Sequence, residues 1–267
     1  MKKIILFSVL LLTGLASIAQ DSTAKTPTRQ ERKKQATTRN NALVKQEEEG
    51  VLSYNKQTAV GLQLRTNGYG LFVELGRSRS PRFTNLYMFE FTEIKHPKEE
   101  KVSNANTFFS NSFVYGKINN FYQAKLGFGQ QYIFGQKGNK NGVAVLGIVE
   151  GGLTMGLLKP YYIQVQEQSV GVRDIKYESA DSVAFLSGNI IGGSGFTKGW
   201  SELKIKPGAF LKTALRFDFG RFNETVQAIE IGMSVDAYAS KIPQMVFNDP
   251  QQFFFQGHFA LVFGRRK

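Results

Sequence analysis

The sequence predicts an all-β fold, a transmembrane antiparallel β-barrel of about ten strands. Apolar and polar residues alternate with a period of two through most of the chain after Thr58, as they do in strands with one apolar face. Many of these segments run ten residues or more, a length that crosses a bilayer at a tilt, whereas strands of soluble proteins average about five or six residues. Aromatic residues lie near the ends of the expected strands, as interfacial girdles require: Tyr69, Tyr87, Tyr122, Tyr132, Phe134, Tyr238 and Phe263.

A soluble sandwich or barrel is the competing interpretation, because it shows the same alternation with its apolar face turned inward. The polar face of this chain carries glycine and charges of both signs. Such a face suits a narrow lumen better than a fully wet surface, so the pattern favours a membrane barrel. The mean hydropathy of −0.24 is no objection, since only alternate residues of a barrel strand face lipid.

The first segment, 1–19, is predicted to be a secretory signal peptide. Lys2 and Lys3 precede an apolar run over 4–12, and small residues lie at Ser17 and Ala19, where a signal peptidase cleaves. Cleavage after Ala19 removes two lysines and lowers the formal net charge from +13 to +11. Because the mature chain then leaves the nucleic-acid compartment, no nucleic-acid partner is expected despite the basic balance.

The next segment, 20–50, is predicted to be a charged, flexible periplasmic tail. Between Asp21 and Gly50 it has no aromatic residue, seven basic residues and five acidic ones. A segment of that composition cannot bury enough apolar surface to order itself. The composition changes at about Val51, so the barrel domain is assigned to 51–267.

Nine segments with long alternation are the first candidates for barrel strands, and parity adds a tenth. A single-chain bacterial barrel normally has an even number of strands and both termini in the periplasm. Residues 161–168 alternate as well and follow the turn-like pair Lys159-Pro160, which makes ten strands. An eight-stranded barrel that discards 58–66 is the alternative. The nine segments are 58–66, 69–77, 84–95, 107–118, 121–134, 142–157, 205–219, 225–238 and 252–264.

The charged residues on the polar faces are expected to point into the lumen. Opposite charges on facing strands would pair there and form a structural network of ion pairs and hydrogen bonds. A small-solute pore is the alternative use of the same residues. The expected lumen network consists of Arg65, Glu74, Glu90, Lys125, Glu150, Lys212, Arg216, Asp218, Glu230, Asp236 and His258.

An outer-membrane hydrolase is a further alternative, since hydrolases need a nucleophile, a base and an orienting group within hydrogen-bond reach. His258 would be the base, Asp236 or Glu230 the orienting group and Ser234 the nucleophile. One such set on adjacent strands is expected by chance, so the chain is not predicted to be an enzyme. It has no Cys and two His, which leaves little room for a metal site, and no metal or cofactor is expected.

The expected external loops carry the remaining basic surplus. The loop 135–141, which contains Lys137, is one of these expected external loops. Cations such as Lys95, Lys98, Lys101 and Lys137 could contact phosphates of lipopolysaccharide. The longest loop, 169–204, is expected to lack regular structure, and loops of that length are usually functional or disordered. Expected partners are outer-membrane lipid, including lipopolysaccharide, and envelope proteins that bind through 21–50 or 169–204.

Several short motifs mark strand ends and turns: Ala19-Gln20, Pro160-Tyr161-Tyr162, Lys198-Gly199-Trp200 before Lys206-Pro207-Gly208, Asp236-Ala237-Tyr238, and the terminal Phe263-Gly264-Arg265-Arg266-Lys267. Over about 58–267 they resemble small outer-membrane barrels of Bacteroidota-type bacteria, and more loosely PorT-type barrels, which are associated with a secretion machinery. The resemblance implies a Gram-negative outer membrane and a structural or accessory role in secretion or envelope assembly. It carries over no catalytic residues.

Overall fold

The computed structural model describes residues 30, 33, 34, 37, 38, 41, 52, 54–103, 111–139, 141–167, 171–178, 180–186, 189–221 and 223–267. The chain divides into two units, 1–45 and 46–267. In the first unit the six described residues are α-helical, and the Thr37 hydroxyl donates to the Lys33 carbonyl at 2.9 Å. The predicted signal peptide, 1–19, lies outside the described residues, and so does the rest of 20–50. None of the helices that are described is long and apolar enough to span a membrane.

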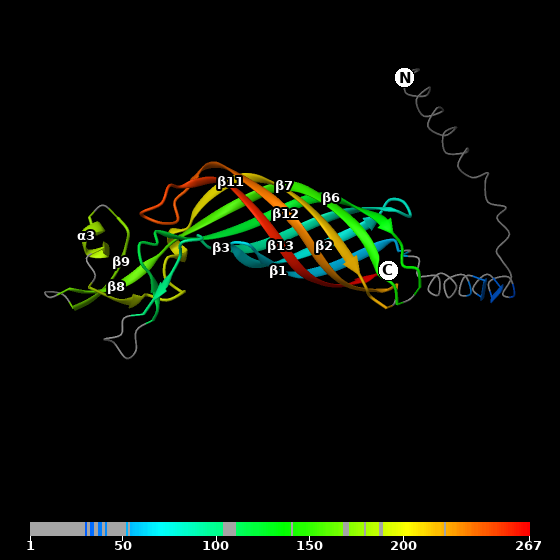
Figure 1. Cartoon of the computed structure of the whole chain (residues 1–267), viewed down its shortest axis with the longest axis horizontal. Coiled ribbons are helices and arrows are strands. Elements are labelled where there is room, and N and C mark those ends of the chain that lie inside the picture. Colours follow the sequence, from blue (N-terminus) through cyan, green and yellow to red (C-terminus); the bar gives the residue numbers. More distant parts are fainter. Residues whose placement is uncertain are drawn as a thin grey trace, which may run out of the picture. The chain divides into compact units, whose positions relative to one another are not determined.

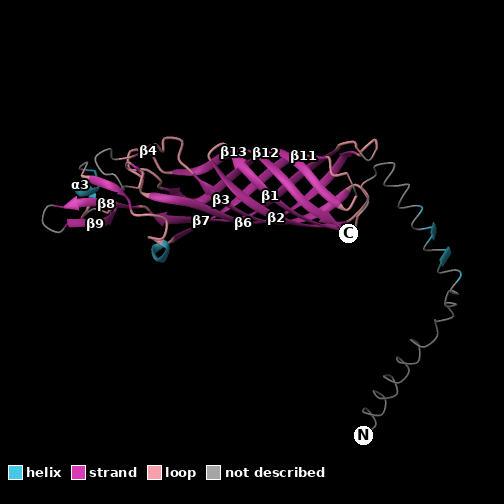
Figure 2. Ribbon diagram, turned by 90° about the horizontal axis from the view of Figure 1, so that it is seen from below, coloured by secondary structure: helices cyan, strands magenta, loops and turns pink. Residues whose placement is uncertain are grey.

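The second unit is built on a closed antiparallel barrel of eight strands (Figures 1 and 2). Each strand pairs with the next barrel strand along the chain, and the first pairs with the last to close the sheet, with Val60 opposite Phe263. The strands are β1 (Lys56–Arg65), β2 (Gly68–Ser78), β3 (Phe83–Ile94), β6 (Asn119–Gly135), β7 (Ala144–Pro160), β11 (Lys204–Asp218), β12 (Thr225–Ile242) and β13 (Gln251–Arg266).

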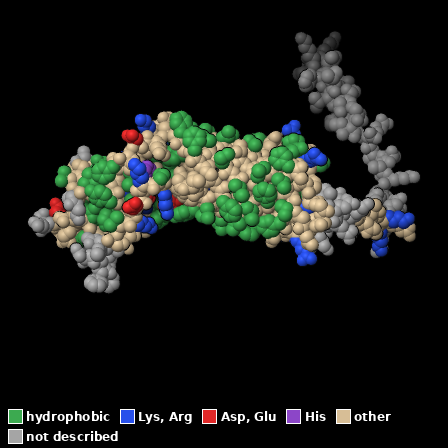
Figure 3. All heavy atoms as spheres, in the orientation of Figure 1, with side chains coloured by type: hydrophobic (Ala, Val, Ile, Leu, Met, Phe, Trp, Pro, Cys, Tyr) green, Lys and Arg blue, Asp and Glu red, His purple; other side chains and the backbone are tan. Residues whose placement is uncertain are grey.

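Alternation along the strands puts apolar side chains outside and polar ones inside. In β1 the side chains of Leu62 and Leu64 are 61% and 66% exposed, whereas the intervening Gln63 is 2% exposed. The same pattern covers the barrel wall with hydrophobic side chains (Figure 3). A soluble barrel would bury these residues. An apolar exterior around a polar interior is the arrangement of a transmembrane barrel, whose closed sheet leaves no unpaired edge in lipid.

Eight strands correct the main prediction of ten and agree with the alternative count. The alternative discarded the wrong segment, however, because 58–66 belongs to β1. The segments that do not join the barrel are 107–118, of which 111–118 is described, and 161–168. Each segment that is wrongly counted as a barrel strand reverses the direction predicted for every strand after it. The predicted positions of the turns between these two segments are therefore inverted: residues 135–141 lie at the same end as the termini, not in an external loop.

The two ends of the barrel differ in the length of their connections. The end where β1 begins and β13 ends, here called the terminal end, has the short connections 79–82, 136–143 and 219–224. The opposite end, here called the loop end, carries the tight turn 66–67 and the longer connections 95–118, 161–203 and 243–250. Outer-membrane barrels have short periplasmic turns and long extracellular loops. This asymmetry predicts that the terminal end faces the periplasm and the loop end faces the outside of the cell.

The longest connection, 161–203, contains regular structure and is called the loop module. The prediction of an irregular loop over 169–204 is therefore wrong. A three-stranded sheet is formed by β8 (Tyr162–Glu167), β9 (Gly171–Lys176) and β10 (Ile190–Gly193), with the short helix α3 (Ser182–Leu186) and the 3-10 turn η1 (Trp200–Glu202). A two-stranded sheet in the preceding loop pairs β4 (Lys101–Val102) with β5 (Phe113–Val114). The module has its own apolar cluster, to which the preceding loop adds Phe113: Phe113, Ile163, Val165, Ile175, Phe185 and Ile190.

Candidate functional site

The structure places all of the predicted lumen residues inside the barrel. They come from all eight strands, and none is more than 7% exposed. Three clusters follow one another along the barrel, called here the loop-side, central and terminal clusters. The residues so placed are Arg65, Glu74, Glu90, Lys125, Glu150, Lys212, Arg216, Asp218, Glu230, Asp236 and His258.

The loop-side cluster joins strands from opposite walls. Lys125 on β6 lies 2.5 Å from Asp236 on β12 and 3.4 Å from Glu90 on β3. Arg65 on β1 pairs with the same Glu90, and its other nitrogen lies 3.3 Å from the Ser234 hydroxyl. Two cations and two carboxylates thus bridge the lumen, so that each buried charge has an opposite charge beside it.

The central cluster is organised around Glu230 on β12. Its carboxylate accepts hydrogen bonds from the Arg216 Nε at 2.9 Å, and it lies 2.9 Å from the Lys212 ammonium. The His258 Nε2 lies 3.1 Å from the same group. Arg216 also reaches across the lumen to Glu74 on β2 at 2.7 Å. Lys212 has a second carboxylate beside it, Glu150 on β7, at 3.5 Å. This cluster ties five strands together.

The terminal cluster includes two residues that were not predicted as lumen residues. Asp218 pairs with Arg266 and lies 3.4 Å from Lys137 of the 136–143 connection. The period of two already contained the signal for Arg266, which has the same parity in β13 as the lumen-facing His258. Lys137 was expected in an external loop. It lies at the terminal end, because two segments assigned to the barrel are not part of it.

Aromatic side chains fill the space between the ion pairs. Phe72 lies 4.4 Å beneath the Lys212 ammonium, and Phe210 lies 5.1 Å from that of Lys125, as ring-centroid distances. Phe72 fits because its register partner is Gly61, where a Cβ would approach the ring to 2.2 Å. Nearer the loop end Phe121, Tyr238 and Phe254 pack on one another and close the lumen further: their ring centroids are 5.3–5.8 Å apart.

The residues of the alternative hydrolase lie in two different clusters. His258 contacts Glu230, which also holds two cations, whereas Ser234 accepts a hydrogen bond from Arg65. Asp236 pairs with Lys125. All four side chains are buried in the filled lumen. Among the described residues, no group of three or more His, Asp or Glu could hold a metal ion.

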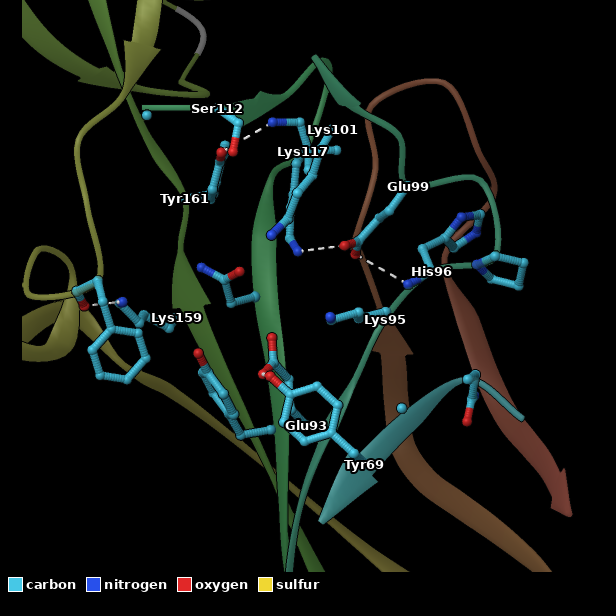
Figure 4. Close-up of a pocket in the computed structure, with 18 of the residues that line it drawn as sticks. Tyr69, Glu93, Lys95, His96, Glu99, Lys101, Ser112, Lys117, Lys159 and Tyr161 are labelled. Carbon is cyan, nitrogen blue, oxygen red and sulfur yellow. Dashed lines mark hydrogen bonds and ion pairs between the residues drawn. The ribbon is translucent and has the colours of Figure 1, made fainter. Parts of the chain in front are cut away.

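A second polar site, here called the loop-end cleft, lies where the barrel meets the loops (Figure 4). Its volume is about 820 Å³. In Figure 4 Lys95 and Lys117 extend from different segments into the same space, with Tyr69 and Glu93 below them in the view. Charged side chains also gather around this end in Figure 3. The ionisable lining residues are Tyr69, Glu93, Lys95, His96, Glu99, Lys101, Lys117, Tyr122, Lys159 and Tyr161.

Hydrogen bonds hold the cleft in shape. The Lys117 ammonium lies 2.6 Å from Glu99, and Glu99 also accepts the His96 amide at 3.0 Å. The Tyr69 hydroxyl donates to Glu93 at 2.5 Å. Burial is the main cause that lowers the pKa of His96, so its ring is neutral at pH 7. The lining then carries four lysines against two glutamates, a surplus of two positive charges.

Solved structures of outer-membrane proteins resemble this chain. The N-terminal β-barrel domain of Pseudomonas aeruginosa OprF matches with 9% identity and a TM-score of 0.37, covering 79% of this chain and 99% of that one. Neisserial surface protein A matches with 7% identity and a TM-score of 0.39, covering 79% and 96%. Ail of Yersinia pestis matches with 8% identity and a TM-score of 0.36, covering 80% and 100%. No family model matches the chain, and no curated protein does.

The chain is an outer-membrane β-barrel, identified by its own exterior and interior. The lipid-facing side chains are apolar on all eight strands, and the interior is charged. In a bilayer every backbone polar group of a spanning segment must be paired within the protein, which a closed barrel achieves. The finer resemblance to PorT-type barrels stays a prediction.

Proposed function

We propose that this chain is a structural or accessory component of the outer membrane that acts through its loop end and not through its lumen. The observation that carries the proposal is the contrast between the two. The lumen is filled by paired charges and by aromatic rings that pack on one another, whereas the loop end carries a module with a core of its own. A barrel with a filled lumen must act by what it presents to other molecules.

The loop module has the features of a surface that is held in a defined shape. Ion pairs connect its parts: Arg173 on β9 lies 2.9 Å from Asp181, and Lys176 lies 2.8 Å from Glu178. Lys176 also pairs with Glu202 of η1, and this contact lowers the pKa of Glu202. Such exposed pairs contribute little energy singly, but together they orient the elements around the apolar cluster.

The same module leaves apolar groups exposed. Val183 on α3 is 80% exposed and Val172 on β9 is 57% exposed. Strand β9 has only β8 as a neighbour in its sheet, so one edge of this strand is open among the described residues. Open edges and exposed apolar side chains favour association with another protein. We infer that the partner is an envelope or secreted protein, in keeping with the resemblance to secretion-associated barrels.

Site-specific photo-crosslinking in native membranes tests which end of the barrel binds a partner. A photoreactive residue at Val183 reports on the loop module, and one at the exposed Arg79 reports on the terminal end as the matched control. A protein crosslinked from position 183 and not from position 79 is the expected result. A variant in which 161–203 is replaced by a short Gly-Asn-Gly turn should fold, because the barrel closes without the module, and should lose the partner on affinity purification.

Two outcomes would contradict the proposal. If the full chain and the module-replaced chain both purify as free monomers, and position 183 yields no crosslink, the accessory role fails. If the crosslink arises at position 79, or the partner is lost only when 21–50 is removed, the contact surface is the periplasmic side and the role assigned to the module is wrong.

A further inference from the structure

The loop-end cleft lies beside a group of aromatic residues on the outside of the barrel. Tyr69 at the start of β2 is 48% exposed on the outer wall, and the Lys95 ammonium lies 4.9 Å from its ring centroid. The Trp200 ring stacks on Tyr122 of β6 at 5.6 Å. Tyrosine and tryptophan concentrate at the headgroup level of membranes. The cleft therefore opens where headgroups of the outer leaflet end.

The lining of the cleft favours an anion. Four lysines converge from the end of β3, from β4, from the residues just before β6 and from the end of β7: Lys95, Lys101, Lys117 and Lys159. Only Lys117 among them has a carboxylate within ion-pair distance in the described part of the chain. Lys159 is 1% exposed, donates to the Phe196 carbonyl and lies 4.9 Å from the Trp200 ring centroid.

The remaining lining groups suit hydroxyl groups of a sugar. Glu93 and Glu99 offer carboxylate oxygens, and the Asn120 side chain offers both a donor and an acceptor. The volume of about 820 Å³ lies within the range of small-molecule sites and accommodates a ligand of disaccharide size. A ligand that satisfies both the lysines and these groups carries phosphate and several hydroxyls.

We propose that the loop-end cleft binds the phosphorylated sugar headgroup of an outer-leaflet glycolipid, with Lys95 and Lys101 as the principal phosphate contacts. Two lysines that face a phosphate form charge-assisted hydrogen bonds, which are stronger than neutral ones. The inference does not depend on a protein partner, since it concerns the junction of the barrel with its loops and not the outer surface of the module.

The proposal is tested by reconstituting the protein in phosphatidylcholine nanodiscs and measuring how tightly it binds bisphosphorylated lipid A. The double variant K95Q/K101Q should bind about tenfold more weakly or worse, because cations near an anionic lipid surface each contribute to binding. The matched control K204Q/K241Q removes two exposed lysines of the loop end that do not line the cleft, and it should bind like the unchanged protein. Dephosphorylated lipid A should bind poorly to all three proteins.

The source of the phosphate is distinguished by a soluble probe, the bisphosphorylated glucosamine disaccharide without acyl chains. Competition by this probe assigns the site to the phosphosugar itself, and binding of the lipid alone assigns it to the membrane-embedded headgroup. Equal losses in K95Q/K101Q and K204Q/K241Q would indicate a general surface charge effect and overturn the proposal. Unchanged affinity of K95Q/K101Q, with an unchanged thermal transition of the barrel, would overturn it as well.

Discussion

Glu230 is the residue on which the central cluster of the lumen depends. Its carboxylate is fully buried and contacts Arg216, Lys212 and His258. Without Glu230, Arg216 would keep only Glu74 at 2.7 Å, and Lys212 would keep only the more distant Glu150 at 3.5 Å. Removing one carboxylate from a buried cluster leaves two cations that are less well compensated, which is strongly destabilising.

The substitution Glu230→Gln should therefore destabilise the folded barrel strongly, by about 3–5 kcal/mol. Equilibrium unfolding in urea, with the barrel in detergent micelles, measures the change. The matched control is Glu224→Gln at the terminal end, where Glu224 and Arg265 are 3.7 Å apart and mostly exposed. That control should change the free energy of unfolding by less than about 0.5 kcal/mol. Equal effects of the two substitutions would show that the central cluster does not stabilise the barrel.

At the scale of elements, the connection that follows β3 contains a histidine that responds to pH. The His96 Nδ1 accepts a hydrogen bond from the Lys98 amide at 3.2 Å. Its pKa lies below the ordinary value, mainly through burial; the nearby Glu99 opposes this shift and Lys98 adds to it. The folded connection binds the neutral ring, while the unfolded connection protonates with the ordinary pKa of about 6.5. The folded connection is therefore most stable above a pH of about 6.5, and its stability falls as the pH drops toward the lowered pKa of His96.

Hydrogen exchange should report this loss as a local opening of the connection. The protection factor of the Lys98 amide is expected to fall between pH 7.5 and pH 5.5, after correction for intrinsic exchange, because a protonated Nδ1 no longer accepts the bond. The Gly142 amide, which donates to the Asn139 carbonyl in a connection of the terminal end, serves as the internal control and should stay constant. The same fall in a His96→Gln variant would refute the role of this ring.

At the scale of the whole molecule, the filled lumen determines whether the barrel conducts. Eight strands enclose an interior just wide enough for side chains to fill. Here three clusters of ion pairs and the rings between them occupy it. The Tyr54 ring adds to this at the terminal end, where its hydroxyl accepts a hydrogen bond from the Gln131 amide at 2.8 Å.

The purified protein is accordingly expected to show no steady porin-like conductance in planar bilayers. A known open porin reconstituted in the same way is the positive control. Steady channels of uniform size at neutral pH would support the alternative of a small-solute porin. They would also mean that the charged clusters rearrange in the membrane, since the paths between them are closed by aromatic rings.

The sequence alone determined which side chains share a face. Successive side chains of a strand point to opposite sides, so the period of two was enough to assign Arg65, Lys125, Glu230 and the other charged residues to the lumen. The length of the alternating segments and the mixed charges of the polar face added the prediction that the apolar face is the exterior. These are local consequences of the pleated backbone, and they do not depend on which strands become neighbours.

Only the tertiary structure decided which alternating segments join the barrel. Residues 161–168 alternate like a barrel strand, but β8 pairs with β9 and β10 and covers its apolar face with Phe185 and Ile190. Alternation reports that a strand has one apolar face, and it cannot report whether lipid or protein covers that face. The loop-end cleft also depends on which strands become neighbours. Lys117 and Lys159 come from other stretches of the sequence than Lys95 and Lys101. The four meet because the pairing of β3 with β6 and of β6 with β7 brings the loop-end termini of these strands together.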